Sequence, residues 1–281
     1  MNDAVPGRLL FDSHMHTPLC RHAYGHPSEY AARGHRAGLR GVVMTCHSPM
    51  PDGFSHAVRM APEEFEDYLA LVTEGAENAP EGFEVRLGME SDYFPGMEGW
   101  LSGLHKRAPF HYILGSVHWH IPEYLDAFWR EDMAAFRRQY FWHLAESAES
   151  GLFDCLAHPD LVKNASAGDW DFVEMRPVIA EALDRIAATR VAMELNTSGA
   201  FKAFPETNPG PAMLAMMAER DIPVVLGSDS HTPDRVGDSF LAALDILETA
   251  GYDAVSQFEN RKRQDLPISL VRESLLAHGL D

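Results

Sequence analysis

Three histidines near the N-terminus have the spacing of metal ligands. His14 and His16 are separated by one residue, and they follow the short apolar run at residues 9–11. If that run is a strand, both imidazoles point to the same side, because side-chain direction repeats every second residue. His22 lies farther along a loop that can fold back towards them. Neutral imidazole nitrogen is a good ligand for zinc and similar ions, so the three residues indicate one side of a metal site.

Further ligand types follow later apolar segments of the chain. Seven short apolar segments have the length of buried strands, and almost every one ends in a histidine, glutamate or aspartate. The predicted strands are residues 8–11, 41–45, 84–89, 112–117, 153–157, 191–195 and 223–227. The candidate ligands at their ends are His14 and His16, His47, Glu90, His118, His158, and Asp229 with His231.

Helix-like sequence separates these strands. Residues 28–38, 62–79, 126–150 and 239–251 have helix start signals or helical periodicity. Strands that alternate with helices form a parallel sheet covered by helices, and both an open doubly wound sheet and a closed barrel satisfy that pattern. Only a ring aims the carboxyl ends of seven strands at one point. The ligand positions therefore favour an α/β fold of the distorted seven-stranded, TIM-like (β/α)7 barrel type, with the metal site at the C-terminal ends of the strands.

The chain shows no internal repeat, low-complexity stretch or linker that would divide it. We therefore expect residues 1–281 to be a single barrel domain, in which residues 253–281 are a peripheral C-terminal extension without an assigned role.

Composition limits the classes of partner. The formal net charge of -19 argues against a nucleic-acid surface, because binding a phosphate backbone normally needs a basic face. The three cysteines contain no CxxC pair, so neither a disulfide framework nor a thiolate zinc site is indicated. The polar N-terminus and the lack of a long apolar stretch predict a cytoplasmic protein without membrane contact. Assembly into a homo-oligomer is left open.

The ligand inventory of seven histidines, one glutamate and one aspartate exceeds the needs of one ion. Three divalent ions would use the whole set: His14, His16, Asp229 and Glu90 for the first, Glu90 with His118 and His158 for the second, and His22, His47 and His231 for the third. Such clusters serve phosphoryl hydrolysis, because the ions lower the pKa of a bridging water and clamp the phosphate oxygens. We expect a phosphomonoesterase in which a metal-bound hydroxide is the nucleophile and Glu90, His118 and Asp229 are catalytic ligands.

Six motifs in order resemble the PHP family, the polymerase and histidinol phosphatase superfamily. They are the run at residues 12–51, LGMESD at 87–92, LGSVHW at 114–119, AHPDLVK at 157–163, ELNTSG at 194–199 and LGSDSH at 226–231. The resemblance spans roughly residues 8–250 and is strongest to the histidinol-phosphate phosphatases within that family. It implies a seven-stranded barrel, three ions of zinc, iron or manganese, and hydrolysis of L-histidinol phosphate to L-histidinol and phosphate in histidine biosynthesis.

One residue departs from the family pattern. Cys46 stands before His47, where such proteins usually have an aspartate that would orient a ligand. A cysteine cannot do this equally well, which puts the metal preference and the occupancy of the third site in question. We interpret Cys46 as a small core residue in preference to a thiolate ligand.

The substrate also needs contacts of its own. Lys163 and Lys202 follow strand ends and Arg21 lies beside His22, so these three are candidate phosphate contacts. Glu194 and Asn196, at the end of the sixth strand, are candidates either to bind the amino group of histidinol or to support ligands.

Two alternative functions remain open at this point. One is a PHP-type phosphoesterase that acts on nucleotides or oligonucleotide ends, against which the acidic chain and the lack of a basic aromatic groove count. The other is a non-catalytic metal-buffering or accessory module, against which the intact set of ligands counts.

Overall fold

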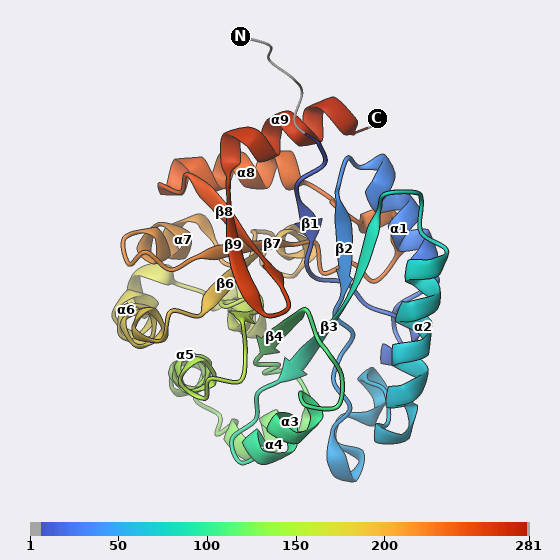
Figure 1. The fold of residues 1–281 in the computed structure, drawn as a ribbon. Helices are drawn as coiled ribbons and strands as arrows, with labels where there is room; N and C mark the ends of the chain where they lie inside the picture. The colour runs from blue at the N-terminus through green and yellow to red at the C-terminus, as the bar shows by residue number, and fades with distance from the viewer. Residues whose placement is uncertain (1–6, 280–281) are drawn as a thin grey trace.

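A ring of parallel strands with helices on its outside organises the computed structural model, which describes residues 7–279 (Figure 1). The strands are β1 (Phe11–Asp12), β2 (Gly41–Met44), β3 (Glu84–Asp92), β4 (Tyr112–Ser116), β5 (Cys155–Leu156), β6 (Ala192–Asn196), β7 (Val224–Gly227), β8 (Ala254–Glu259) and β9 (Lys262–Pro267). Each strand pairs with the next one in the sequence, in parallel from β1 to β8 and antiparallel between β8 and β9.

The ring closes between the segments that follow β1 and β7. Met15 forms a parallel bridge with Ser230. The His16 amide donates to the Ser230 carbonyl at 2.9 Å, and the Ser230 amide donates to the His14 carbonyl at 3.1 Å. The first seven strands therefore form the predicted distorted barrel, and their carboxyl ends meet at one opening.

The inside of the ring is apolar towards the amino ends of the strands. Residues that alternate with the outward-facing core side chains form one buried cluster: Phe11, Val43, Tyr112, Leu114, Cys155, Ala157, Ala192, Val225 and Phe258. The Arg86 guanidinium lies 3.9 Å from the centre of the Phe11 ring and donates to the Phe258 carbonyl at 3.1 Å. This packed end leaves only the opposite end of the ring for polar chemistry.

The helices surround the ring on all sides in Figure 1. They are α1 (Pro27–Arg36), α2 (Phe65–Glu77), α3 (Glu98–Leu104), α4 (Pro122–Phe128), α5 (Met133–Glu149), α6 (Phe172–Thr189), α7 (Pro211–Ala218), α8 (Phe240–Ala250) and α9 (Ile268–His278). Within residues 7–279, none of these helices is both long and apolar enough to cross a membrane.

One predicted helix is two helices in the structure. Residues 126–150 were expected to form a single helix, but α4 ends at Phe128 and α5 begins at Met133. Glu131 adopts a left-handed backbone conformation with φ of 59°, and the Asp132 side chain caps α5 by accepting from the Ala135 amide at 2.9 Å. The cap therefore starts a separate helix at Met133.

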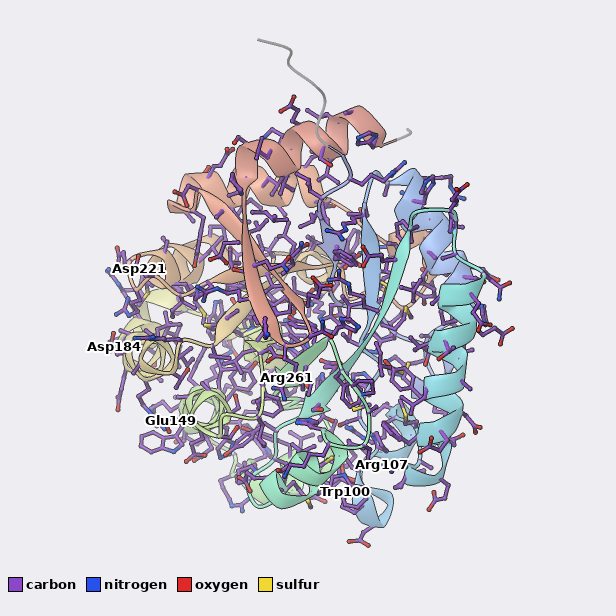
Figure 2. All side chains as sticks on the ribbon, in the orientation of Figure 1. Trp100, Arg107, Glu149, Asp184, Asp221 and Arg261 are labelled. Carbon is purple, nitrogen blue, oxygen red and sulfur yellow. The ribbon has the colours of Figure 1, made fainter. Side chains whose placement is uncertain are left out.

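The C-terminal segment adds to the sheet. The predicted extension at residues 253–281 contains β8, which pairs with β7 where Val225 lies opposite Ser256. Arg261, in the turn between β8 and β9, donates to the Asp154 carboxylate at 3.0 Å and lies at the front of the view in Figure 2. The turn also contacts His111 and Leu152, which precede β4 and β5, so the β8–β9 hairpin crosses the amino end of the ring.

Candidate metal centre

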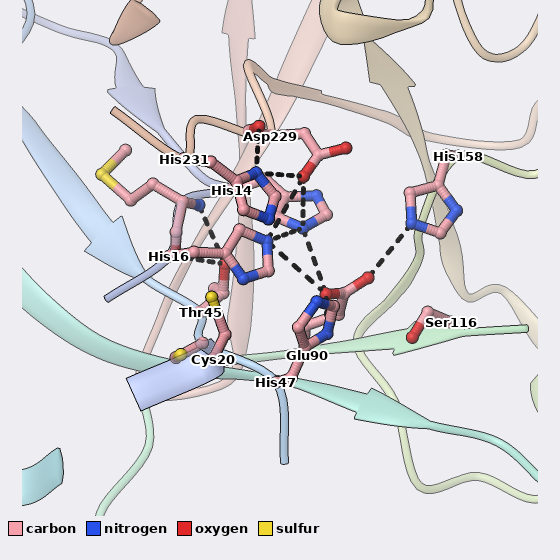
Figure 3. A network of polar contacts seen from close by, with 12 residues as sticks. His14, His16, Cys20, Thr45, His47, Glu90, Ser116, His158, Asp229 and His231 are labelled. Atoms are coloured by element: carbon pink, nitrogen blue, oxygen red, sulfur yellow. Dashed lines mark hydrogen bonds and ion pairs between the residues drawn. The ribbon is translucent and has the colours of Figure 1, made fainter. Parts of the chain in front are cut away.

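The carboxyl ends of the strands bring the predicted ligands into one cluster, and most of them are labelled in Figure 3. His14 Nε2 lies 3.5 Å from Glu90 Oε2 and 3.6 Å from Asp229 Oδ1. His16 Nε2 lies 3.3 Å from the same oxygen of Asp229 and 3.6 Å from Glu90 Oε2. Two imidazoles and two carboxylates thus face a common point, as expected of the first ion site.

Glu90 lies in the middle of the cluster. Its Oε2 atom is 2.8 Å from His47 Nδ1, and its Oε1 atom is 3.1 Å from His158 Nε2 and 3.4 Å from His118 Nε2. Glu90 comes from β3, whereas the three histidines follow β2, β4 and β5. One fully buried carboxylate therefore faces ligands on both sides, which is the geometry of a bridging ligand.

The third predicted group lies at the outer edge of the cluster. His22 Nε2 and His231 Nε2 are 3.0 Å apart, and the rings of His16 and His231 stack with centroids 3.9 Å apart. The ring of His47 lies 5.5 Å from that of His22. Because His47 also contacts Glu90, it stands between the second and third groups. The structure thus brings all nine predicted ligands together, and their binding of metal remains a prediction.

The donor atoms of this cluster fit divalent metal ions. His14 Nε2 and His16 Nε2 are 3.2 Å apart, and Glu90 Oε2 lies within 3.6 Å of ring nitrogens of His14, His16 and His47. Nitrogen lone pairs and carboxylate oxygens packed this closely repel one another unless cations lie between them. Imidazole nitrogen with carboxylate oxygen is the ligand set of zinc, iron and manganese.

Charges within the cluster shift several pKa values. Burial raises the pKa of Glu90, but the neighbouring histidines, His47 and His14 foremost, outweigh burial and hold that pKa well below its ordinary range. Burial lowers the pKa of His47 to about 4. Burial also lowers the pKa of His16, but a hydrogen bond with Asp229 contributes to raising it to about 9. At pH 7, Glu90 is therefore ionised and His47 is neutral, whereas His16 holds a proton that a metal ion must displace.

Two buried carboxylates hold ligand imidazoles from behind. Glu194 Oε1 lies 2.7 Å from His14 Nδ1, and Asp92 pairs with His118 Nδ1. Each contact places the ring proton on Nδ1 and leaves the Nε2 lone pair facing the cluster. Asn196 Nδ2 donates to Glu194 Oε2 at 3.0 Å. Of the two roles predicted for Glu194 and Asn196, the geometry favours support of ligands over contact with substrate.

Backbone carbonyls orient two further ligands. His22 Nδ1 lies 2.7 Å from the Cys20 carbonyl, and His231 Nδ1 lies 3.0 Å from the Asp229 carbonyl. Both contacts leave Nε2 free to face inwards.

A cavity of about 690 Å³ opens above the cluster. Besides predicted ligands, its lining contains Trp119, His120, Leu161, Asn164, Ser198, Phe201, Lys202, Ala203, Thr232 and Arg235. Lys202 Nζ lies 3.3 Å from Asp229 Oδ2, and the Arg235 guanidinium lies 3.9 Å from the centre of the Phe201 ring. Lys202 and Arg235 thus give the cavity wall two positive charges.

Comparison with known proteins identifies the family. A family model described as the PHP domain matches residues 12–198. The chain belongs to the PHP family. It is 38% identical over 262 residues to a protein named "Probable histidinol-phosphatase" from Deinococcus radiodurans, a match that covers 91% of this chain and 98% of the relative. It is 24% identical to the "Histidinol-phosphatase" of Bacillus subtilis, over 83% of this chain and 98% of that protein.

A solved PHP-type structure shares the fold. The histidinol phosphate phosphatase of Lactococcus lactis, in complex with zinc, L-histidinol and phosphate, superposes with a TM-score of 0.74 at 19% identity. The superposition covers 91% of this chain and 98% of that one.

Lys163 does not lie where the sequence placed it. Its side chain is completely buried, with Nζ 3.0 Å from Asp160 Oδ2, 3.2 Å from Glu206 Oε2 and 2.6 Å from the Thr207 carbonyl. It is not among the residues that line the cavity. The prediction of a phosphate contact is therefore corrected: Lys163 is an internal ion pair that joins the segments after β5 and β6.

Arg21 is also turned away from the cavity. It has a left-handed backbone conformation with φ of 73°, and its guanidinium pairs with Glu64, the last residue of the short 3-10 helix Pro62–Glu64 before α2. Proximity to His22 in the sequence therefore does not bring this side chain to the cavity lining.

Arg235, on the cavity wall, and Asp92, behind His118, are two residues around this site that the sequence analysis did not single out. Asp92 lies two residues after Glu90 in β3, so the alternation of side chains along a strand was a signal that could have found it. Arg235 ends the short 3-10 helix Pro233–Arg235, where no periodic pattern predicts the direction of a side chain.

Proposed function

We propose that the protein is a metal-dependent histidinol-phosphatase, which hydrolyses L-histidinol phosphate to L-histidinol and phosphate in histidine biosynthesis. The observation that carries the proposal is the placement of Glu90 between ligands from the ends of several strands, at the floor of a cavity with a cationic wall. The relative with 38% identity over nearly the whole chain supports the choice of substrate.

Three divalent ions are the proposed cofactors, with the metal identity left among zinc, iron and manganese. The proposed ligands are His14, His16, Asp229 and Glu90 for the first ion, Glu90, His118 and His158 for the second, and His22, His47 and His231 for the third. Bound ions of this kind supply an activated water and neutralise the charge that develops on the phosphate. The chain contributes the arrangement, because Glu194 and Asp92 fix the tautomers of two ligand histidines.

The cationic wall is the proposed phosphate contact. Arg235 donates through Nε to Asp238 Oδ2 at 2.7 Å, and its buried Nη2 has no protein partner within the described residues. A guanidinium matches the geometry of phosphate oxygens, and Lys202 adds a point charge beside Asp229. The organic end of the substrate then faces Trp119 and His120. His120 is neutral there, because burial lowers its pKa to about 3.

The proposed location is the cytoplasm. Cys20, Cys46 and Cys155 are all free and buried, and free thiols persist in a reducing compartment.

Phosphate release from L-histidinol phosphate by the purified protein tests the function, with p-nitrophenyl phosphate and a nucleoside 3',5'-bisphosphate as comparison substrates. We expect a strong preference for histidinol phosphate that chelation abolishes and added metal restores. Equal rates on all three substrates would contradict the proposed substrate but keep the metal centre. Unchanged rates after complete metal removal would contradict the metal centre itself.

A further inference from the structure

The second ring nitrogen of His16 points away from the metal cluster, towards two cysteines. His16 Nε2 faces Asp229 Oδ1 at 3.3 Å, so Nδ1 lies on the opposite edge of the ring. A ring nitrogen of His16 and the Sγ atoms of Cys20 and Cys46 lie within 4.8 Å of one another. Figure 3 shows Cys20 on the side of His16 that faces away from Asp229 and Glu90.

The Nδ1 atom of His16 needs a hydrogen-bond acceptor. A histidine that binds metal through Nε2 carries its proton on Nδ1, and a buried N–H without an acceptor is costly. His14 and His118 meet this need with the carboxylates of Glu194 and Asp92. His16 Nδ1 is buried and makes no hydrogen bond of full geometry among the residues that the structure describes. The Sγ atoms of Cys20 and Cys46, which lie within 4.8 Å of a ring nitrogen of His16, are the candidate acceptors.

The sulfur of Cys46 is oriented to accept. Thr17 Oγ1 donates to Cys46 Sγ at 3.1 Å, and the Cys46 thiol lies 3.6 Å from the Thr17 carbonyl, to which it donates. With its proton directed to that carbonyl, the sulfur keeps lone pairs for a further donor. Cys46 and His16 are both completely buried, so water does not compete for the contact.

We propose that Cys46 is a positioning residue of the metal centre, whose sulfur accepts the hydrogen bond from His16 Nδ1–H and so holds Nε2 towards the metal. The inference rests on the proposed metal centre, which it deepens. Cys46 is then neither a space-filling core residue nor a metal ligand, and it occupies the place behind His16 that a carboxylate occupies behind His14.

Metal affinity of the full-length protein tests this role. Metal-depleted protein is titrated with Zn²⁺ against a chromophoric chelator, and we expect Cys46→Ala to bind at least one equivalent about 10-fold more weakly than the wild type. Cys46→Ser, whose hydroxyl can accept the same proton, should recover part of the loss. The matched control is Cys155→Ala, because Cys155 is equally buried in β5 and should leave every equivalent unchanged.

Equal Zn²⁺ affinities of Cys46→Ala and the wild type would overturn the positioning role but leave the proposed function intact. A wild type that takes up no metal would overturn both. Urea unfolding of the metal-depleted variants separates loss of affinity from loss of fold, and matching midpoints of Cys46→Ser and Cys155→Ala are expected.

Cobalt substitution distinguishes positioning from ligation. A thiolate ligand gives a sulfur-to-cobalt charge-transfer band in the near ultraviolet, which imidazole and carboxylate ligands do not give. We expect the Co²⁺ protein to lack this band and Cys46→Ala to alter only the visible ligand-field spectrum. A near-ultraviolet band that disappears in Cys46→Ala would show direct coordination and would overturn the inference.

Discussion

Glu194 Oε1 lies 2.7 Å from Nδ1 of His14, and both side chains are buried. The contact joins β6 to the segment after β1, and it passes beside Gly227 of β7. A Cβ atom at Gly227 would lie 2.1 Å from Glu194 Oε1 and 2.7 Å from His14 Cβ, so only glycine leaves room there. The orientation of His14, a proposed ligand, thus depends on the lack of a side chain at Gly227 in a third strand.

Glu194→Gln should weaken metal binding without unfolding the protein. The amide keeps the size of the side chain but loses the charge that favours an N–H on His14 Nδ1. We expect metal affinity and kcat/KM to fall by about 10- to 100-fold. Zn²⁺ titration and steady-state kinetics measure both effects. Glu146→Gln on α5 is the control, because the Glu146 carboxylate accepts from the exposed Trp142 at the surface, away from the metal cluster; equal losses in both variants would contradict a specific role.

Arg235→Met should impair phosphate recognition. Loss of a hydrogen bond to a charged group costs about 1.5–3 kcal/mol, so we expect kcat/KM for histidinol phosphate to fall by about 10- to 100-fold and inhibition by inorganic phosphate to weaken in parallel. Arg185→Met is a matched control. Arg185 also lies over an aromatic ring, that of Trp142 at 4.4 Å, and also pairs with a carboxylate, that of Glu149.

Unchanged phosphate inhibition in Arg235→Met would place the guanidinium outside the substrate contacts. Metal content should stay at the wild-type level in both arginine variants, because neither residue is a proposed ligand.

Lys163→Met should mainly lower the stability of the fold, whereas Lys202→Met should mainly lower kcat/KM. Lys163 is an internal cation paired with Asp160 and Glu206, so its loss leaves buried negative charge and should lower the free energy of unfolding by about 3 kcal/mol. Lys202 lines the cavity beside Asp229, so its loss should lower kcat/KM with little change in stability. Urea unfolding and kinetics on the folded protein separate the two, and a Lys163 variant that is stable but inactive would restore the original prediction.

Metal uptake should release protons and become tighter as the pH rises. Burial lowers the pKa of His14 and of His16, but Glu194 helps to raise that of His14 well above its ordinary range, and Asp229 helps to raise that of His16 to about 9. Both are therefore protonated in the metal-free protein at pH 7. Burial lowers the pKa of His118, but Asp92 helps to raise it above its ordinary value as well, so binding should release roughly two or more protons. Calorimetric titrations in buffers with different ionisation enthalpies measure that number, and a value near zero would contradict it.

The metal-free protein should in turn be less stable in alkaline solution. A histidine whose pKa is raised on folding contributes stability that is fully present below its unfolded pKa, about 6.5, and lost as the pH rises through the folded value. For His16 this window runs from about 6.5 to about 9. We expect the urea midpoint of metal-depleted protein to be lower at pH 9 than at pH 7, whereas equal midpoints would exclude the effect.

The ligand cluster could be predicted because the direction of a side chain in or just after a parallel strand follows from its place in the sequence. A residue such as Glu90, inside a strand, or His14, two residues beyond one, has its position fixed by the parallel sheet, so sequence order and period sufficed to gather the set. The backbone conformation of the turns that carry ligands could not be predicted from the sequence. His158 and Asp229 adopt left-handed backbone conformations, with φ of 26° and 51°, which non-glycine residues rarely adopt.

Side chains on the loops could not be placed in the same way. Lys163 follows a strand end and Arg21 lies beside His22 in the sequence, but their side chains turn inwards to Glu206 and outwards to Glu64. The choice depends on distant carboxylates, which no local pattern reveals. For the same reason Arg235 was missed, because its position depends on Phe201 from another loop.

Closure of the ring passes through the metal site itself. The hydrogen bonds that join the segments after β1 and β7 are made by His14, His16 and Ser230, between the proposed ligands of the first ion. An ion held by His14, His16 and Asp229 therefore fastens the barrel along its seam. Removing that ion should loosen the seam before any other part of the sheet, so amide exchange at His16 and Ser230 would report metal loss directly.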